Sequence, residues 1–346
     1  MTIVSDLTRM RLCKFRSMKR AWYSLLILSV AYFLSLFSEI LVNDRPIVFS
    51  YQEQIYYPIF EHYPATEFGG KYRTEANYRK LFENKVFLEK VNWKIFPPIP
   101  HDPLYSNLDI EENPPHAPST RHWLGTDENA RDILARIIYG FRNCMSFSIF
   151  LTIIIAILGV VLGGIQGYLG GKTDFAMQRV IEIWSSLPFL YVVIVIASIY
   201  GRSFWILVMI LSLFSWIGLS YYIRAEFLKL KSLTYVKVAK SLGYSPTRVF
   251  FKHILPNALT PVVTILPFSL IGGISALTSL DFLGFGLNPP TPSWGELIQQ
   301  GLKNLFAPWI TVFTVLALFI TLMLAAFIGE GVREAFDPKG GGDERG

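Results

Sequence analysis

Six apolar stretches constrain the fold of this sequence more than any other feature. A helix needs roughly 20 mostly apolar residues to cross the hydrocarbon core of a membrane. The stretches approach or meet that length, and they cover residues 22–42, 144–168, 183–200, 203–223, 258–280 and 307–328. The sequence therefore predicts an all-α, polytopic membrane protein of about six transmembrane helices.

Composition supports a membrane environment. Hydrophobic residues make up 52% of the chain and charged residues 17%, whereas charged residues make up roughly a quarter of a soluble domain. The net charge of +6 could suggest nucleic acid, but the basic residues lie between apolar runs and not on one solvated face. The first apolar stretch follows six basic residues as a signal peptide would. It is long and no clear cleavage site follows it, so we expect a retained anchor.

The distribution of basic residues predicts the orientation. Lys and Arg gather in segments that six crossings place on the same side, whereas the two short loops on the other side hold only Arg202 and Lys303. By the positive-inside rule that side is the cytoplasm, and both termini lie there. The inside residues are Arg9, Arg11, Lys14, Arg16, Lys19, Arg20, Lys172, Arg179, Arg224, Lys229, Lys231, Lys237, Lys240, Arg248, Lys252 and the three basic residues of the tail.

The spans and loops give a predicted domain organisation. Residues 1–21 form a cytoplasmic N-terminal segment, 22–42 the anchor helix, and 43–143 a periplasmic segment that contains an interfacial helix over 127–142. Residues 144–331 form a five-helix core with a cytoplasmic coupling loop over 224–256, and 332–346 form a cytoplasmic tail.

The long outside segment shows no extended apolar periodicity. A run of prolines from Pro97 to Pro118 predicts an extended stretch of polyproline type, so the segment looks like a strap or a small cap. Thr126 or Asp127 can cap the following helix, whose apolar positions recur at three and four residues. That helix either lies in the membrane interface or packs against the bundle.

Small residues and prolines mark particular helices for packing. Gly159, Gly163 and Gly167 recur at every fourth residue, which leaves a flat stripe where another helix can approach closely. Pro256, Pro261 and Pro267 predict a kinked fifth span that either lines a pathway or is merely bent.

Catalytic and metal-binding patterns are lacking in the sequence. Cys13 and Cys144 cannot build a disulfide framework, and the five histidines show no paired ligand spacing. Gly170-Gly171-Lys172-Thr173 lacks the upstream glycine and strand of a phosphate-binding loop. We therefore expect no cofactor, no metal and no catalytic residue. The carboxylates Glu39, Glu182, Asp281 and Glu330 fall near span ends, which weakens the hypothesis of a proton-coupled carrier.

The inside segment 224–256 has helical signals of its own. Thr234 can cap a short helix in which Val236, Ala239 and Leu242 share a spacing of three, and Gly243 takes the C-terminal capping position. Ser245-Pro246 then begins a second short helix that leads into the membrane. The segment offers a docking place for a partner that supplies energy.

These residues resemble a known family. The run from Tyr235 to Gly243 and the run Ile254-Leu255-Pro256-Asn257 are similar to the cytoplasmic coupling motif of ABC importer permeases. Further motifs place the resemblance in the dipeptide and oligopeptide branch; they are 122–127 with Arg131-Asp132, 279–286, 292–296 and 333–338. Residues 63–70 and 93–98 are similar to the Yej-type permeases, which are associated with uptake of peptides and of microcin C.

The resemblance implies a type I ABC importer permease fold in the bacterial inner membrane. It implies a heterodimer with a second permease subunit, two cytoplasmic ATPase subunits, a periplasmic solute-binding protein and a peptide cargo. It assigns ATPase coupling to Tyr235, Val236, Lys237, Ala239, Leu242, Gly243, Ile254, Leu255 and Pro256. Lys237 and Val238 replace the usual glutamate and first alanine. We therefore expect coupling to depend on Ala239 and Gly243 more than on Lys237.

Two alternatives stay open at this point. The first is a proton-coupled secondary transporter, which would depend on a deep carboxylate such as Glu182 or Asp281. The second is a membrane enzyme that uses Glu61, His62, His101 and Asp102 of the outside segment as acids and bases.

Overall fold

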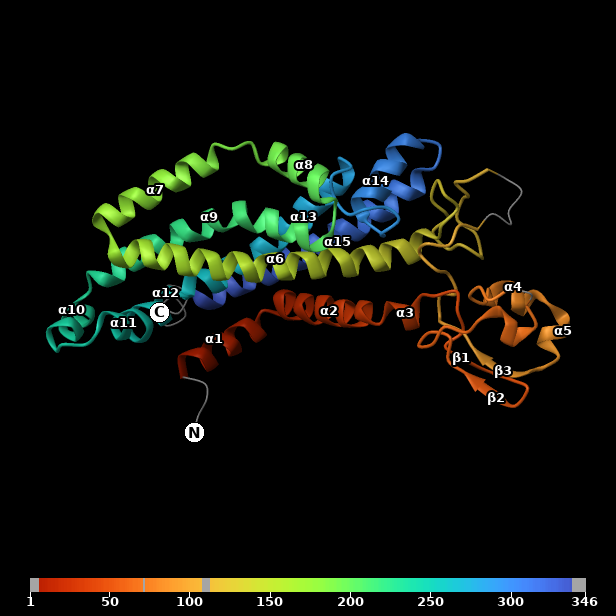
Figure 1. Cartoon of the computed structure of the whole chain (residues 1–346). Coiled ribbons are helices and arrows are strands. Elements are labelled where there is room, and N and C mark those ends of the chain that lie inside the picture. Colours follow the sequence, from red (N-terminus) through yellow and green to blue (C-terminus); the bar gives the residue numbers. More distant parts are fainter. Residues whose placement is uncertain (1–5, 71, 108–112, 338–346) are drawn as a thin grey trace. The chain divides into compact units, whose positions relative to one another are not determined.

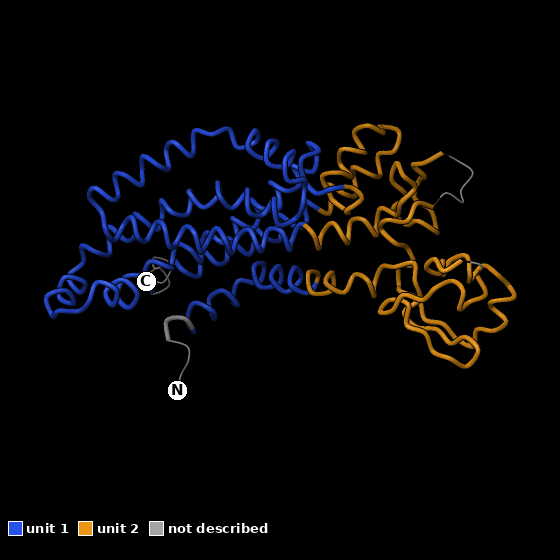
Figure 2. The backbone as a smooth tube through the Cα atoms, in the orientation of Figure 1, with its two compact units in different colours: residues 1–30, 144–288, 318–346 blue, residues 31–143, 289–317 orange. Residues whose placement is uncertain are grey.

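The structure is a computed structural model that describes residues 6–70, 72–107 and 113–337 (Figure 1). Residues 1–5 of the predicted N-terminal segment and residues 338–346 of the predicted tail, including Pro338 of the last motif, lie outside the described part. The chain forms two compact units (Figure 2). Unit 1 comprises residues 1–30, 144–288 and 318–346, and unit 2 comprises residues 31–143 and 289–317.

Unit 1 is helical in its described part. Three of its helices, α2, α6 and α15, continue into unit 2. Its longer helices are α1 Asp6–Ser17, α2 Lys19–Leu36, α6 Ile133–Leu169, α7 Gly171–Ser185, α8 Phe189–Tyr200, α9 Phe204–Lys231, α13 Thr260–Phe282 and α15 Pro308–Phe336.

The membrane spans agree with the sequence in four places and differ in two. Among the described residues, α6, α9, α13 and α15 are long and apolar enough to cross a membrane. The helices α7 and α8 raise the number to five if they count as one broken span, since they are bent by 71°. Pro188 precedes α8 and has no N–H with which to continue α7. The predicted span over 183–200 therefore begins inside α7 and is not straight.

The first apolar stretch is not one helix over 22–42. The helix α2 ends at Leu36, Phe37 leaves the helical conformation with φ −102° and ψ 28°, and a short α3 follows at Ser38–Leu41. The helix α2 does not meet the length and hydropathy test for a span. Its first turn contains Lys19 and Arg20, which lower its mean hydropathy.

Unit 2 contains a small module with its own core, which the sequence did not predict. Three short strands, β1 Val48–Tyr51, β2 Gln54–Tyr56 and β3 Val91–Ile95, form an antiparallel sheet in the order β2-β1-β3. The register pairs Phe49 with Tyr56 and with Lys94. The connection from β2 to β3 holds the 3₁₀ helix η1 Ala65–Phe68 and the helices α4 Tyr78–Glu83 and α5 Lys85–Leu88.

Aromatic side chains form the core of this module. The buried side chains of Phe49, Tyr51, Phe68, Tyr78 and Phe87 pack together, with Phe49 and Phe68 rings 5.6 Å apart. Aromatic pairs add roughly 0.5–1.5 kcal/mol each beyond the area they bury. Of the two sequence interpretations, the structure favours a small cap over a simple strap.

The helix predicted over 127–142 as a separate element is the start of α6. Asp127 accepts hydrogen bonds from the backbone N–H groups of Asn129 and Arg131, which folds residues 127–131 into a tight loop. Asp132 then accepts a bond from the N–H of Ala135 at 2.8 Å and caps the helix. The cap is therefore Asp132 and not Thr126 or Asp127, and α6 runs without a break to Leu169.

Candidate functional site

The first residues of the predicted coupling loop, 224–231, belong to α9, which ends at Lys231. The remainder, residues 232–256, is called the coupling segment here and begins with the short helix α10 Thr234–Ser241. Leu233 occupies the N-cap position without a side-chain bond, so the prediction that Thr234 caps the helix is wrong. The helix ends in a Schellman motif, in which Gly243 N–H donates to the carbonyl of Lys240 and Tyr244 N–H to that of Ala239. Gly243 has a φ of +79°, which explains why a glycine stands there.

The two faces of α10 differ in exposure. Val236 and Ala239 are buried on the inner face. Leu242, which the spacing placed on the same face, is 67% exposed because the helix ends one residue before it. Tyr235, Val238 and Leu242 together form an exposed apolar stripe, which we call the α10 stripe.

The second half of the segment returns the chain to the membrane helices. Ser245 accepts a hydrogen bond from Arg248 N–H and caps α11 Pro246–Arg248, with Pro246 in the first turn. A π-helix, Val249–Ile254, and α12 Leu255–Ala258 follow. Pro256 has no N–H to donate to the preceding turn, and π-type turns are frequent at functional sites. Of the predicted coupling residues here, Ile254 is buried and Pro256 is exposed.

The ends of α6 and α9 hold the coupling segment. The Tyr168 hydroxyl at the end of α6 donates to the carbonyl of Pro246, and the Tyr168 ring lies edge-on to Phe250. The Phe250 ring also lies 5.0 Å from that of Phe227 on α9. Lys231 donates to the carbonyl of Tyr168 at 2.9 Å. The segment is thereby in direct contact with both helix ends.

Polar contacts join the two halves of the segment. The Tyr235 hydroxyl donates to the carbonyl of His253, and the Asn257 amide donates to that same carbonyl at 3.1 Å. Because His253 lies in the π-helix and Tyr235 in α10, these bonds make the segment one unit.

The glycine stripe lies where α6 runs beside α9 (Figure 1). A Cβ added to Gly163 would lie 2.5 Å from the carbonyl oxygen of Ser220, and one added to Gly167 would lie 2.6 Å from that of Arg224. The same addition at Gly159 meets the side chain of Leu219 at 2.9 Å. The close approach of the two helices therefore requires glycine at these positions.

An ion pair links α7 to α9 near the coupling segment. The Arg224 guanidinium donates to both carboxylate oxygens of Asp174, at 2.6 and 2.7 Å. Such bidentate pairs fix geometry as well as adding attraction.

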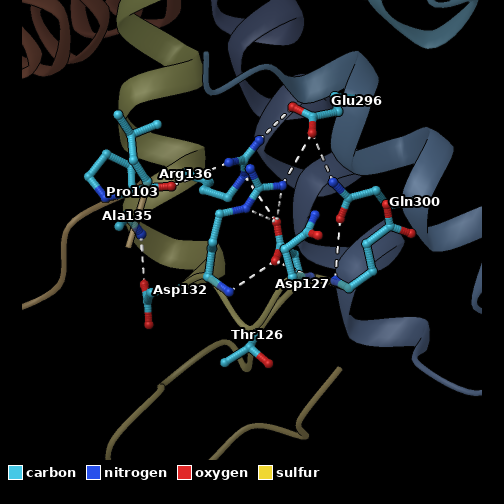
Figure 3. A network of polar contacts seen from close by, with 12 residues as sticks. Pro103, Thr126, Asp127, Asp132, Ala135, Arg136, Glu296 and Gln300 are labelled. Atoms are coloured by element: carbon cyan, nitrogen blue, oxygen red, sulfur yellow. Dashed lines mark hydrogen bonds and ion pairs between the residues drawn. The ribbon is translucent and has the colours of Figure 1, made fainter. Parts of the chain in front are cut away.

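Unit 2 contains a buried network of charges, which Figure 3 shows. Arg136 donates to Glu296 at 2.5 Å and lies 3.4 Å from Asp127, while Arg131 donates to Asp127 at 2.8 Å. Gln300 also donates to Glu296. The two arginines balance the two carboxylates, which is what burial of such groups requires. The sequence motifs at 122–132 and 292–296 contain Asp127, Arg131 and Glu296 of this network, but the sequence did not predict that they meet.

The helix α14 Trp294–Lys303 packs on the first part of α6 in the same unit. The Trp294 indole donates to the carbonyl of Ile137, and a Cβ on Gly140 would lie 2.7 Å from the Trp294 ring. Ser293 caps α14 by accepting from Glu296 N–H. Glu296 of α14 also belongs to the buried network, so the network joins α14 to α6.

The structure corrects the interpretation of the histidines. His101 and His122 stand 21 positions apart, yet their rings lie 4.5 Å apart, and ligand atoms of both lie within 4.8 Å of an Asp132 oxygen. Their pairing is tertiary, so sequence spacing could not show it. Burial lowers the pKa of His101, which favours its neutral form.

Four residues of the two alternative functions have local partners of their own. His62 is exposed and lies against Arg45 and Glu75, while Glu61 accepts from the Tyr63 hydroxyl. Glu182 pairs with Arg179 at 2.7 Å. Asp281 accepts from Leu287 N–H and shapes the loop after α13.

Comparison with known proteins decides the family. The model of the "binding-protein-dependent transport system inner membrane component" matches residues 159–340, more than half of the chain. The chain belongs to this family of permeases. The match begins at the glycine stripe and contains the whole coupling segment.

Two relatives match the permease over nearly its full length, and a third matches part of it. It is 41% identical to the inner membrane ABC transporter permease protein YejE of Escherichia coli, over 98% of this chain and 99% of the relative. It is also 41% identical to the peptidoglycan transport system permease protein YejE of Agrobacterium fabrum, over 97% and 94%. The oligopeptide transport system permease protein OppC of Haemophilus influenzae is 36% identical over 63% of this chain and 70% of its own.

The permease is therefore a membrane subunit of an ABC transporter, as the motifs predicted. The alternative of a proton-coupled secondary transporter is wrong, because these relatives are ABC transporter permeases.

Proposed function

We propose that this permease imports peptides across the bacterial inner membrane and couples to ATPase subunits through α10. The observation that carries the proposal is the exposure of α10: Val236 and Ala239 on its inner face are buried, and its outer face leaves the α10 stripe exposed. The hydroxyl of Tyr235 also bonds α10 to the π-helix at His253. An exposed apolar stripe on a helix fits the groove of a protein partner.

The complex around it follows from the family. We propose a second permease subunit, two ATPase subunits that hydrolyse ATP, and a solute-binding protein on the outer side. The chain itself hydrolyses nothing in this scheme. The relatives are named for oligopeptides, dipeptides and peptidoglycan, so a peptide chain is the cargo chemistry that their names share, and peptide antibiotics of the microcin C kind fall in the same class.

The basic residues support a proposed topology. Six crossings are obtained when α2 and the bent pair α7 and α8 each cross once, together with α6, α9, α13 and α15. Both ends of the chain and the coupling segment then lie in the cytoplasm, where Lys and Arg concentrate. Residues 43–143 lie on the outer side.

Movement of the coupling segment provides the mechanism. Closure of the ATPase subunits on ATP displaces α10, and the contacts of Tyr168 and Phe250 carry the displacement into α6 and α9. Rocking of helices around a fixed pathway is the general route to alternating access.

The test is co-purification under a tag on this chain, with ATP hydrolysis measured in the recovered complex. Leu242→Asp places a charge on the α10 stripe and should lose the ATPase subunits. Lys252→Glu, which changes the charge of an exposed residue in the π-helix outside the α10 stripe, is the control and should retain them. Full recovery of ATPase subunits with Leu242→Asp, or a wild-type chain that purifies alone, would refute coupling through α10.

A further inference from the structure

A small cavity in unit 2 is lined by charged, amide, imidazole and phenol side chains. Its volume is about 10 Å³, which is close to the space that a single water molecule or ion needs. The lining residues are Asp44, Arg79, His101, Asp102, Tyr105, Asn107, His122 and Asp132. Transport through the membrane helices, as proposed above, does not use them.

The two histidines are oriented as metal ligands are. His101 Nε2 lies 2.7 Å from the carbonyl oxygen of Arg121, and because a carbonyl only accepts, Nε2 carries the proton and Nδ1 has a free lone pair. His122 Nδ1 lies 2.8 Å from Asp132 Oδ2 and donates to it, which leaves the lone pair on Nε2. Metal-bound histidines almost always donate their other N–H to a carbonyl or carboxylate in this way.

Asn107 adds an independent sign of a ligand. Its side chain is 2% exposed and its Nδ2 lies 3.0 Å from His122 Nε2. Its Oδ1 is buried and has no hydrogen-bond partner in the described part of the chain. A buried amide oxygen without a partner is costly, and a cation at the cavity would give it one.

The charge of the lining fits a divalent cation. Three carboxylates, those of Asp44, Asp102 and Asp132, face one guanidinium, that of Arg79, so acidic groups outnumber the guanidinium in the lining. The Arg79 guanidinium lies over the Tyr105 ring and forms no ion pair within 4.0 Å among the described residues. A cation has a route of entry, because a pocket of about 480 Å³ shares Asp44, Arg79, His101 and Asp132 with the cavity.

We propose that this cavity binds one divalent transition-metal ion of the zinc type. His101 and His122 are the protein ligands, since their ligand atoms lie within 4.8 Å of one another, and the Asn107 oxygen joins them after its amide turns over. Asp132 is not a ligand but holds the His122 ring, by accepting from Nδ1–H, so that Nε2 is presented to the ion. Two imidazoles with oxygen ligands favour zinc over magnesium or calcium, which take oxygen alone. The ion ties the proline-rich stretch that carries His101 and Asn107 to the N-terminus of α6.

The experiment measures zinc in the purified full-length chain in detergent. The protein is loaded with ZnCl₂, dialysed, and analysed for metal per chain by elemental analysis. The same loading with CoCl₂ reports the geometry through visible absorption. Wild type should retain one equivalent and give the strong absorption of four-coordinate Co²⁺.

Variants assign the ligands. His101→Gln should lower the zinc affinity at least tenfold, whereas His62→Gln, at a histidine of the same unit whose side chain is 75% exposed, should bind as wild type does. Circular dichroism and the elution volume show whether each variant is folded. Should His101→Gln fail to fold, the Co²⁺ spectrum of the wild type decides alone.

Three results would overturn the proposal. They are a wild-type chain that retains no zinc after loading, a folded His101→Gln chain that retains as much as wild type, and Co²⁺ with the weak absorption of a six-coordinate aqua ion. Retention of Mg²⁺ or Ca²⁺ in preference to zinc would likewise contradict the proposed histidine ligands.

Discussion

Gly243→Ala is the change whose cost the structure defines most closely. Gly243 has a φ of +79°, and a Cβ added there meets no atom within 4 Å. The penalty is therefore that of the left-handed backbone alone, about 1–2 kcal/mol. A cost of that size changes the ratio of the formed to the frayed end of α10 by a factor of roughly 5–30. We expect faster hydrogen exchange over residues 234–244 and a similar fall in peptide-driven ATP hydrolysis in proteoliposomes.

Gly284→Ala is the matched control. Gly284 has a φ of +80°, no atom within 4 Å of an added Cβ, and the same motif, in which Gly284 N–H donates to Asp281 and Phe285 N–H to Leu280. The two substitutions carry the same backbone cost, but only the first lies in the coupling segment. Equal loss of ATP hydrolysis in both, or wild-type hydrolysis with Gly243→Ala despite faster exchange, would refute the reasoning.

Three further predictions concern packing, buried charge and pH. Gly163→Leu should lower the thermal unfolding temperature in detergent, at a cost of at least 1–3 kcal/mol, because its Cβ would lie 2.5 Å from the carbonyl oxygen of Ser220. Arg136→Met should cost about 3–5 kcal/mol in the same assay, because it leaves buried carboxylates such as Asp127 without a balancing charge. Burial, with a smaller effect of a neighbouring carboxylate, raises the pKa of Asp44 from 3.8 to about 6, so its ionisation destabilises the fold as pH rises through that range. Asp44→Asn should therefore stabilise the metal-free chain by at most about 3 kcal/mol at pH 7.5 and not at pH 3.5.

Each of these has a control in the same chain. Gly272→Leu, at a glycine of α13 with no atom within 4 Å of an added Cβ, should be tolerated far better than Gly163→Leu. Adding Glu296→Gln to Arg136→Met should recover part of the loss, and no recovery would count against charge balance as its cause. A gain with Asp44→Asn that does not change between the two pH values would show that ionisation of Asp44 is not responsible.

The membrane helices could be predicted because hydropathy alone determines them. Long apolar stretches have no alternative in lipid, so α6, α9, α13 and α15 lie where the stretches stand. The capping position of Gly243 could also be predicted, since a glycine after a short helical pattern commonly ends the helix. The helix break at Phe37 could not be predicted, because no proline or glycine marks it.

Unit 2 was poorly predicted for a different reason. Its strands have three to five residues, too few for an alternating pattern to stand out, and its core is made by rings brought together from Phe49 to Phe87. No pattern in the sequence marks a partner for Arg136 at the start of α6, because the partner, Glu296, comes from α14. The pairing of His101 with His122 also depends on tertiary folding.

The two ends of the aromatic module lie side by side. Asn43 N–H donates to the carbonyl of Ile99, and Ile99 N–H donates to that of Leu41, so residues 42 and 99 are bridged side by side. A segment whose two ends meet can be inserted into a loop, or removed from it, without displacing what precedes and follows it. Residues 44–98 thus have the form of a cassette that evolution can exchange between permeases while the membrane helices stay the same.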